Sequence, residues 1–110
     1  MTSKKPAAGK RARLPRTTDY THTFLKDWKR LSRSGRHDMG RLKQAMLLLI
    51  ANDQPLGPEW RDHPLKGEWV GYRECHIGGD FLLIYAVANG GKVGQVIFVR
   101  AGTHAELFRE

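Results

Sequence analysis

Three histidines, an aspartate and an arginine fall within one stretch of the sequence, at His63, His76, Asp80, Arg100 and His104. Histidine has an unperturbed pKa of roughly 6.5, so its imidazole can take up or release a proton near neutral pH. Arginine presents a permanent charge on a planar fork that suits a phosphoryl group. Proton carriers and a phosphate-binding cation are what a nuclease needs to move protons around a phosphate. This set of side chains therefore predicts a small nuclease.

The positive charge of the chain is concentrated at its N-terminus. The 110 residues include 19 Lys and Arg and 11 Asp and Glu, a formal charge of +8, which favours nucleic acid or an acidic partner. Residues 17–110 carry 13 basic and 11 acidic side chains, however, a net charge of only +2. We expect residues 1–13 to be a disordered basic arm that contacts RNA or a partner, or only aids solubility. Residues 14–110 are expected to form one domain.

A single cysteine, Cys75, excludes an intramolecular disulfide and a zinc site built from cysteines. Such cysteine usage is typical of a reducing cytoplasm. No apolar run approaches the roughly 18 residues needed to span a bilayer, and the basic N-terminus is not followed by the apolar region of a signal peptide. We therefore expect a cytoplasmic protein that does not enter the membrane.

Two amphipathic helices are predicted in the first half of the chain. Phe24, Trp28 and Leu31 recur at helical spacing, which predicts a helix from about Thr21 to Ser34 that ends at Gly35. Asp38 can cap a second helix, whose apolar face comprises Met39, Leu42, Ala45, Met46, Leu49 and Ile50. The prolines and glycine that follow predict a loop that runs to about Lys66.

The remaining residues have the composition of antiparallel strands. Gly78-Gly79-Asp80 and Asn89-Gly90-Gly91-Lys92 separate three segments rich in β-branched and aromatic residues, Trp69–Ile77, Phe81–Ala88 and Val93–Ala101. A further opening strand is permitted within Leu14–Tyr20. Two helices followed by a meander predict an α+β domain. Both N-terminal helices are expected to pack on one face of a mainly antiparallel four-stranded sheet.

Three blocks in the second half carry a family resemblance. They are Asp62–Ile77, Asp80–Tyr85 and Arg100–Phe108. Together they resemble the YafQ branch of the RelE/ParE superfamily, over about residues 17–109. Because three separate blocks agree in order and in spacing, the resemblance is far more specific than one short motif.

The resemblance implies a toxin of a bacterial type II toxin–antitoxin system that cuts messenger RNA in the ribosomal A site. It also implies a compact RelE-like domain and an acidic antitoxin as partner, with operator DNA bound through the complex of the two. The implied functional positions are His63, His76, Asp80, Arg100, His104 and Phe108. In one departure, close members often have tryptophan after the aspartate, whereas Phe81 stands here and lacks the indole donor.

RNA carries its own nucleophile, the 2′-hydroxyl, so proton carriers suffice to cleave it without a metal. General acid and base groups typically contribute about 10² to 10⁴-fold. We assign His104 as the general acid because it follows the last predicted strand, close to Arg100, the predicted phosphate clamp. The general base stays open among Asp80, His63 and His76.

Aromatic residues near these positions could contact RNA bases. Phe81 and Phe108 are candidates for stacking on a base, and Tyr72 and Arg73 are possible further RNA contacts. A structural role is the alternative for each, since Asp80 could close a hairpin and Phe108 could cover the core. Four more residues are given packing or surface roles, namely Trp69, Tyr85, His22 and His37.

Other classes of function compete with this interpretation. His63, His76, His104 and Asp80 could instead ligate a metal, but no pair has the spacing of common zinc motifs, so we expect no metal and no cofactor. A ParE-like toxin that binds DNA gyrase would need no cluster of histidines. An inactive toxin that acts only as a co-repressor with its antitoxin is the third alternative.

Overall fold

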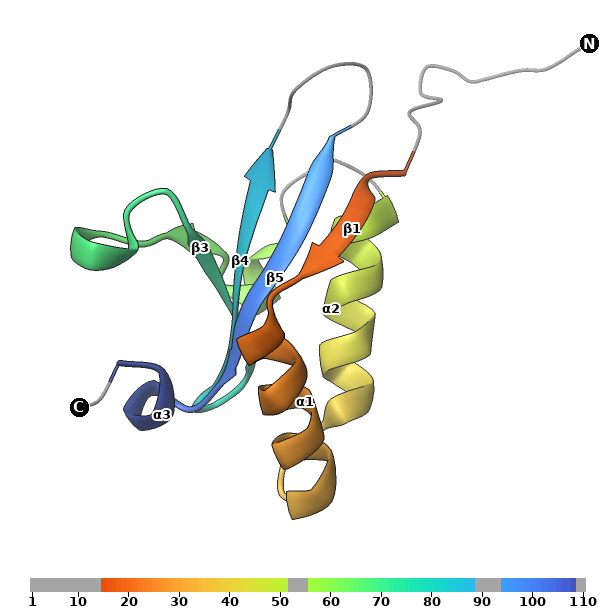
Figure 1. The fold of residues 1–110 in the computed structure, drawn as a ribbon, viewed down its shortest axis with the longest axis vertical. Helices are drawn as coiled ribbons and strands as arrows, with labels where there is room; N and C mark the ends of the chain where they lie inside the picture. Colours follow the sequence, from red (N-terminus) through yellow and green to blue (C-terminus); the bar gives the residue numbers. More distant parts are fainter. Residues whose placement is uncertain (1–14, 52–55, 89–93, 109–110) are drawn as a thin grey trace, which may run out of the picture.

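The computed structural model describes residues 15–51, 56–88 and 94–108 (Figure 1). The predicted basic arm, residues 1–13, and the predicted turn at residues 89–92 lie outside these ranges. None of the helices in these ranges has the length and hydrophobicity of a membrane-spanning segment.

Both predicted helices are confirmed, and so are the residues predicted to end the first and to begin the second. Helix α1 (His22–Ser34) begins after Thr21, whose hydroxyl accepts a hydrogen bond of 2.9 Å from the Phe24 backbone nitrogen. It ends at Gly35, where φ is 67°. Helix α2 (Met39–Ala51) begins after Asp38, whose carboxylate accepts a hydrogen bond of 2.9 Å from the Arg41 backbone nitrogen.

The sheet has five strands rather than four, and one of its pairings is parallel. The strands are β1 (Thr17–Tyr20), β2 (His63–Pro64), β3 (Arg73–Gly78), β4 (Phe81–Ala88) and β5 (Gln95–Gly102). Their order is β1-β5-β4-β3-β2, and β1 runs parallel to β5 whereas the other three pairings are antiparallel. A parallel pair needs a long connection, which the intervening helices and strands supply.

Two further elements differ from the prediction, and both lie next to the candidate site described below. The strand expected from Trp69 begins only at Arg73, because Gly67–Trp69 forms a 3₁₀ turn (η3) and Gly71 adopts a φ of 96°. A short helix, α3 (His104–Phe108), follows β5 and was not expected. Another 3₁₀ turn, η2 (Pro58–Trp60), precedes β2.

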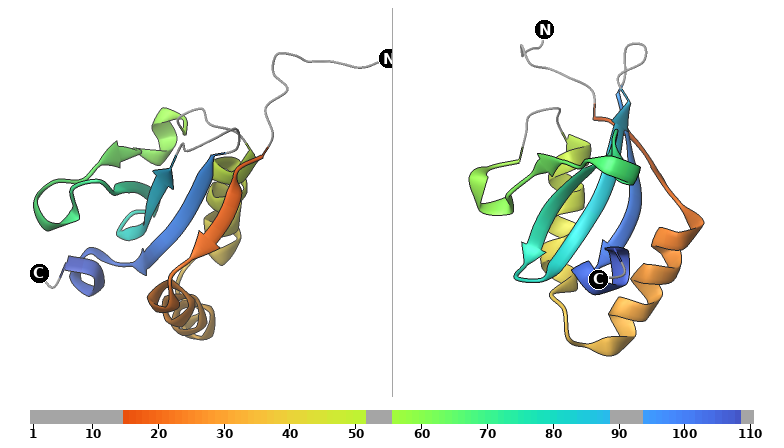
Figure 2. Two further views of the ribbon diagram at one scale, coloured as in Figure 1. Left: turned by 45° about the horizontal axis from the view of Figure 1, so that its top comes forward. Right: turned by 90° about the vertical axis from the view of Figure 1, so that its left-hand side faces the viewer.

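The two faces of the sheet are covered differently. Side chains of α1 and α2 form one core cluster with residues of the central strands such as Ile77, Leu83 and Phe98, so both helices do pack on one face. In Figure 1 these helices lie to the right of the strands, whereas α3 and the β2–β3 segment lie to the left. On that second face Leu82, Ile84 and Leu107 form a smaller cluster. Figure 2 shows α3 and the β2–β3 segment on the side of the sheet away from α1 and α2. The candidate site is built beside this smaller cluster.

Candidate active site

Two of the predicted histidines share one buried carboxylate. Strands β2 and β3 pair so that His63 lies opposite Glu74. The Glu74 carboxylate, whose side chain is only 5% exposed, lies 2.9 Å from Nε2 of His63 and 3.4 Å from Nε2 of His76. Buried carboxylates are stabilised only where partners of this kind surround them. Glu74 therefore holds both imidazoles in place, a role that we did not predict for it.

The three predicted histidines form a row across the open face. The ring centroids of His63 and His76 lie 6.0 Å apart, and those of His76 and His104 lie 6.1 Å apart. These side chains come from β2, β3 and α3, so residues far apart in the sequence meet here. The structure thus brings the three histidines together on one face.

Asp80 fixes the orientation of His104. Its Oδ1 accepts a hydrogen bond of 3.0 Å from the backbone nitrogen of His104 and lies 2.5 Å from the ring Nδ1. Hydrogen bonds from the backbone and then from the side chain of His104 lower the pKa of Asp80 below its ordinary value. An ionised Asp80 therefore holds Nδ1 and leaves Nε2 of His104 for a substrate.

A capping box places His104 at the start of α3. The Thr103 backbone nitrogen donates to Oε1 of Glu106 at 2.9 Å, and the Glu106 backbone nitrogen donates to the Thr103 hydroxyl at 3.2 Å. A side chain at the preceding residue would displace Glu106 from this capping box, since a Cβ at Gly102 would meet Oε1 of Glu106 at 2.7 Å. The end of β5 thus turns directly into the short helix that carries the histidine.

Arg100 is paired with a buried acid of helix α1. Its Nε and Nη2 donate to the two carboxylate oxygens of Asp27 at 3.0 and 2.9 Å. Asp27 is 3% exposed and also accepts the Ala101 backbone nitrogen at 3.1 Å. The hydrogen bond to Asp27 raises the pKa of Arg100. The edge of the guanidinium that was expected to clamp a phosphate is therefore occupied by Asp27, which lies on the buried face of α1 three residues after Phe24.

A groove beside the histidine row is lined by aromatic and charged side chains. Its volume is about 490 Å³, and it is bounded by Lys66, Glu68, Trp69, Arg100, Leu107 and Phe108. The Phe108 ring lies 5.9 Å from the Trp69 ring and 6.0 Å from His104. Phe108 is therefore partly open beside the predicted general acid, as a base-stacking residue should be.

Phe81 lies in the core rather than in this groove. Its side chain is 4% exposed and belongs to the cluster that α1 and α2 cover. Its ring packs on that of His37 with centroids 4.6 Å apart. Phe81 thus presents no open face on which a base could stack in this structure, because the strand alternation that exposes Asp80 turns the next side chain inward.

Tyr72 and Arg73 are also engaged within the protein. The Tyr72 ring packs edge-on against Trp69 at 5.5 Å. Arg73 donates from Nε to Asp62 at 3.2 Å, and Asp62 accepts the Tyr85 hydroxyl at 2.6 Å. The two contacts of Asp62 link the residue before β2 to strands β3 and β4. Contact of either residue with RNA stays a prediction.

One group of side chains in the row could also ligate a metal ion. Nitrogen and oxygen atoms of His63, Glu74 and His76 all lie within 4.8 Å of one another. Two imidazoles and a carboxylate are a donor set that suits zinc or copper. The set considered from the sequence included Asp80 and His104 in place of Glu74, but those two side chains pair with each other.

Comparison with known proteins identifies the family. A family model described as "Bacterial toxin of type II toxin-antitoxin system, YafQ" matches residues 16–109. The mRNA interferase toxin YafQ of Escherichia coli K12 is 41% identical over 95 residues, which span 86% of this chain and 98% of that protein. Compact α+β toxins are thus the class that the fold and the site define.

Solved structures agree with this result. The E. coli DinJ–YafQ toxin–antitoxin complex matches with a TM-score of 0.72 and 42% identity, over 86% of this chain and 99% of that one. A metal-bound toxin from Helicobacter pylori matches with a TM-score of 0.72 and 39% identity, over 84% and 98% of the two chains. The chain belongs to the YafQ family of bacterial type II toxins.

Proposed function

We propose that this toxin is an mRNA interferase, an endoribonuclease that cleaves messenger RNA in the ribosomal A site and so inhibits translation. The observation that carries the proposal is the row of His63, His76 and His104, whose imidazoles are held by Glu74 and Asp80. The name of the E. coli relative, mRNA interferase toxin, supports the same activity. A gyrase-binding toxin would have no use for these paired proton carriers.

His104 is the general acid in this proposal. With Nδ1 engaged by Asp80, the opposite ring nitrogen is the one that protonates the departing 5′ oxygen. Asp80 acts as a positioning residue rather than as the base, because the hydrogen bonds from His104 lower its pKa and make its carboxylate a weaker proton acceptor. This removes Asp80 from the three candidates for the base.

The general base is then one of the two histidines that share Glu74. Either His63 or His76 takes the proton of the 2′-hydroxyl, and the buried Glu74 carboxylate stabilises the imidazolium that forms. Attack of the 2′ oxygen on the phosphorus breaks the bond to the 5′ oxygen. The products are a 2′,3′-cyclic phosphate and a 5′-hydroxyl, and no metal takes part.

The substrate RNA lies over the groove next to His104. A base stacks on the partly exposed ring of Phe108, and Lys66 together with the outer side of Arg100 supplies positive charge for a phosphate. Because Asp27 already holds the inner side of the Arg100 guanidinium, that cation is oriented before the substrate arrives. Preorganised charge of this kind stabilises a transition state most effectively.

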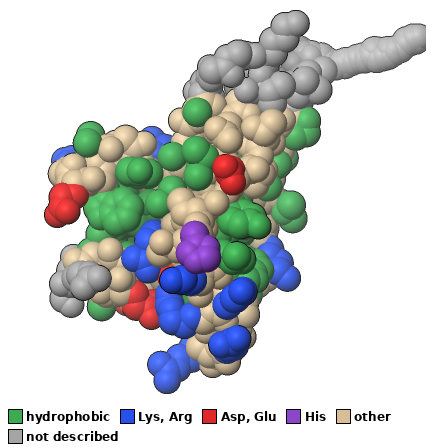
Figure 3. Space-filling view, viewed as in Figure 1, with side chains coloured by type: hydrophobic (Ala, Val, Ile, Leu, Met, Phe, Trp, Pro, Cys, Tyr) green, Lys and Arg blue, Asp and Glu red, His purple; other side chains and the backbone are tan. Residues whose placement is uncertain are grey.

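An acidic antitoxin is the proposed partner. Figure 3 shows Lys and Arg side chains gathered over the end of the molecule where α1 lies, and the whole chain has a formal charge of +8. A related toxin has been solved in complex with the antitoxin DinJ. An acidic, partly disordered chain that folds over the active-site face would silence the enzyme in the cytoplasm, and the complex would bind operator DNA.

A programmed ribosome tests the proposal. Purified toxin, freed of antitoxin, is added to ribosomes with one defined codon in the A site, and both ends of the cleaved RNA are identified. A cut within that codon that leaves a cyclic phosphate and a 5′-hydroxyl supports the proposal. An intact message in the presence of folded toxin contradicts it.

A further inference from the structure

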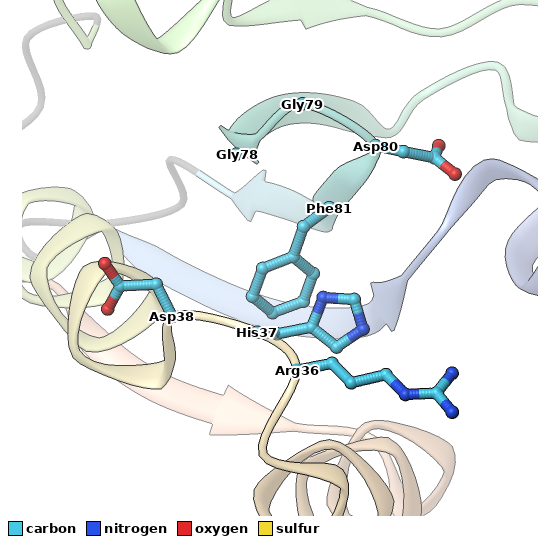
Figure 4. Close-up of a pocket in the computed structure, with 7 residues that line it drawn as sticks. All are labelled: Arg36, His37, Asp38, Gly78, Gly79, Asp80 and Phe81. Carbon is cyan, nitrogen blue, oxygen red and sulfur yellow. The ribbon is translucent and has the colours of Figure 1, made fainter.

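His37 forms an aromatic surface on the far side of Asp80 from the groove. It lies in the connection between α1 and α2, and its ring packs on Phe81 with the ring planes 36° apart (Figure 4). Phe81 is buried, whereas His37 remains partly exposed. The side chain that a ligand would meet here is therefore the imidazole, with Phe81 as its support.

A small pocket opens beside this ring. Its volume is about 210 Å³, and it is lined by Arg36, His37, Asp38, Gly78, Gly79, Asp80 and Phe81. At Gly78 and Gly79 no atom lies within 4 Å of the place that a Cβ would take, so the peptide edges of the turn are open to a ligand. Asp80 lines the pocket and also binds His104, so the pocket adjoins the predicted general acid.

The two carboxylates that line the pocket are engaged by groups other than Arg36. The carboxylate of Asp38 caps α2 and points away from Asp80 in Figure 4, and Asp80 is paired with His104. Within the part of the chain that the structure describes, Arg36 forms no ion pair. A cation, an aromatic face and bare peptide edges are the combination that binds single-stranded nucleic acid.

We propose that this pocket binds a nucleotide of the substrate RNA next to the scissile phosphate. The base stacks on His37, and Arg36 contacts the adjoining phosphate. The inference rests on the proposed ribonuclease function, and it adds to the groove at Phe108 a second subsite on the other side of Asp80. Both residues are binding residues that hold the strand across the Asp80–His104 pair and take no part in proton transfer.

A mutant cycle with modified RNA tests this subsite. Binding is measured on ribosomes programmed with message that carries a 2′-deoxy scissile nucleotide, with the base on either side of the cut intact or removed. His37→Ala should weaken binding about tenfold on intact RNA and leave it unchanged when the base that stacks on His37 is absent. His37→Phe should retain most of the affinity, since it keeps the stack on Phe81. Arg36→Ala should weaken binding and reduce its salt dependence.

His22→Ala and Arg33→Ala are matched controls, because these exposed residues of α1 lie outside the pocket. Thermal unfolding of each variant shows whether uncovering Phe81 has altered the fold. The proposal is overturned if His37→Ala weakens binding equally on intact RNA and on RNA that lacks the base on either side of the cut. It is also overturned if His37→Ala does not weaken binding at all. Failure of the ribonuclease proposal is a separate result, because it requires that the wild type leaves every message intact, whereas this cycle measures binding alone.

Discussion

The carboxylate of Asp80 accepts hydrogen bonds from both the backbone nitrogen and the ring of His104. One side chain in the β3–β4 turn therefore fixes the position of α3 and the orientation of the imidazole that it carries. The two residues meet because β4 and β5 pair so that Leu82 lies opposite Gly102. The general acid of the proposed reaction thus depends on the register of the sheet.

His104→Ala should lower the cleavage rate by about 10² or more with little change in stability, because a general acid acts in the transition state and this side chain is partly exposed. Rates on programmed ribosomes and thermal unfolding measure the two effects. His22→Ala, which alters an exposed histidine of α1, is the control and should be nearly silent. A wild-type rate in His104→Ala would show that the wrong histidine was assigned.

Asp80→Asn should reduce cleavage by about tenfold or more at neutral pH, because the neutral amide orients His104 without stabilising its charge.

The difference in unfolding free energy between the wild type and Asp80→Asn should also depend on pH. Hydrogen bonds from His104 lower the pKa of Asp80 in the folded protein. Ionised Asp80 therefore stabilises the fold at pH values above the pKa that Asp80 has in the unfolded chain. This stabilisation is lost as the pH falls through the lower pKa of the folded state. Denaturant unfolding should therefore give a wild-type advantage at about pH 5 that shrinks below about pH 4. An advantage that grows in acid would contradict this sign.

Asp27→Ala should destabilise the protein by about 3 kcal/mol, because it leaves Arg100 facing a buried site without its partner. Arg100→Lys should also lower the stability, since a single ammonium cannot satisfy both carboxylate oxygens. Lys29→Ala, an exposed change on the same helix, should stay within about 0.5 kcal/mol of wild type. If Arg100→Lys abolishes cleavage at unchanged stability, the phosphate clamp expected from the sequence is the main role of Arg100.

Transition-metal chelators should leave cleavage intact on ribosomes kept at constant Mg²⁺, because the proposed reaction uses only protons. Added zinc should inhibit, since the donor atoms of His63, Glu74 and His76 can converge on one ion and would then no longer carry protons. Glu74→Gln should weaken that inhibition. Activity that chelators abolish and one specific metal restores would mean that the cluster is a catalytic metal site.

Local signals explain which elements the sequence predicted. Thr21, Gly35 and Asp38 mark the ends of the first two helices because capping involves residues only a few positions apart. The pairing of β1 with β5 and the two-residue β2 depend on contacts distant in sequence, so no local pattern indicated them. Helix α3 was missed because it is too short for an apolar period, although Thr103 and Glu106 have the spacing of a capping box.

The site was predictable to the same extent. Its histidines and Asp80 were found from their chemistry and from the family resemblance, but the pairing of Asp80 with His104 and the role of Glu74 were not. Glu74 shares a face of β3 with His76, and this period of two could have identified it. The burial of Asp27 could have been expected, because it lies three residues after Phe24 and four before Leu31 on one face of α1. Its pairing with Arg100 and the packing of His37 on Phe81 could not be predicted, because each depends on a partner from a distant element.

The central claim is that the RNA supplies its own nucleophile, and replacing the 2′-hydroxyl of the scissile nucleotide with hydrogen tests it most directly. Cleavage of the deoxy message should be undetectable on ribosomes that bind the toxin as tightly as before, because attack on the phosphorus has lost its oxygen. The unmodified message should yield a 2′,3′-cyclic phosphate and a 5′-hydroxyl in the same assay. Cleavage of the deoxy message at a similar rate would mean that water is the nucleophile and would contradict the proposed mechanism.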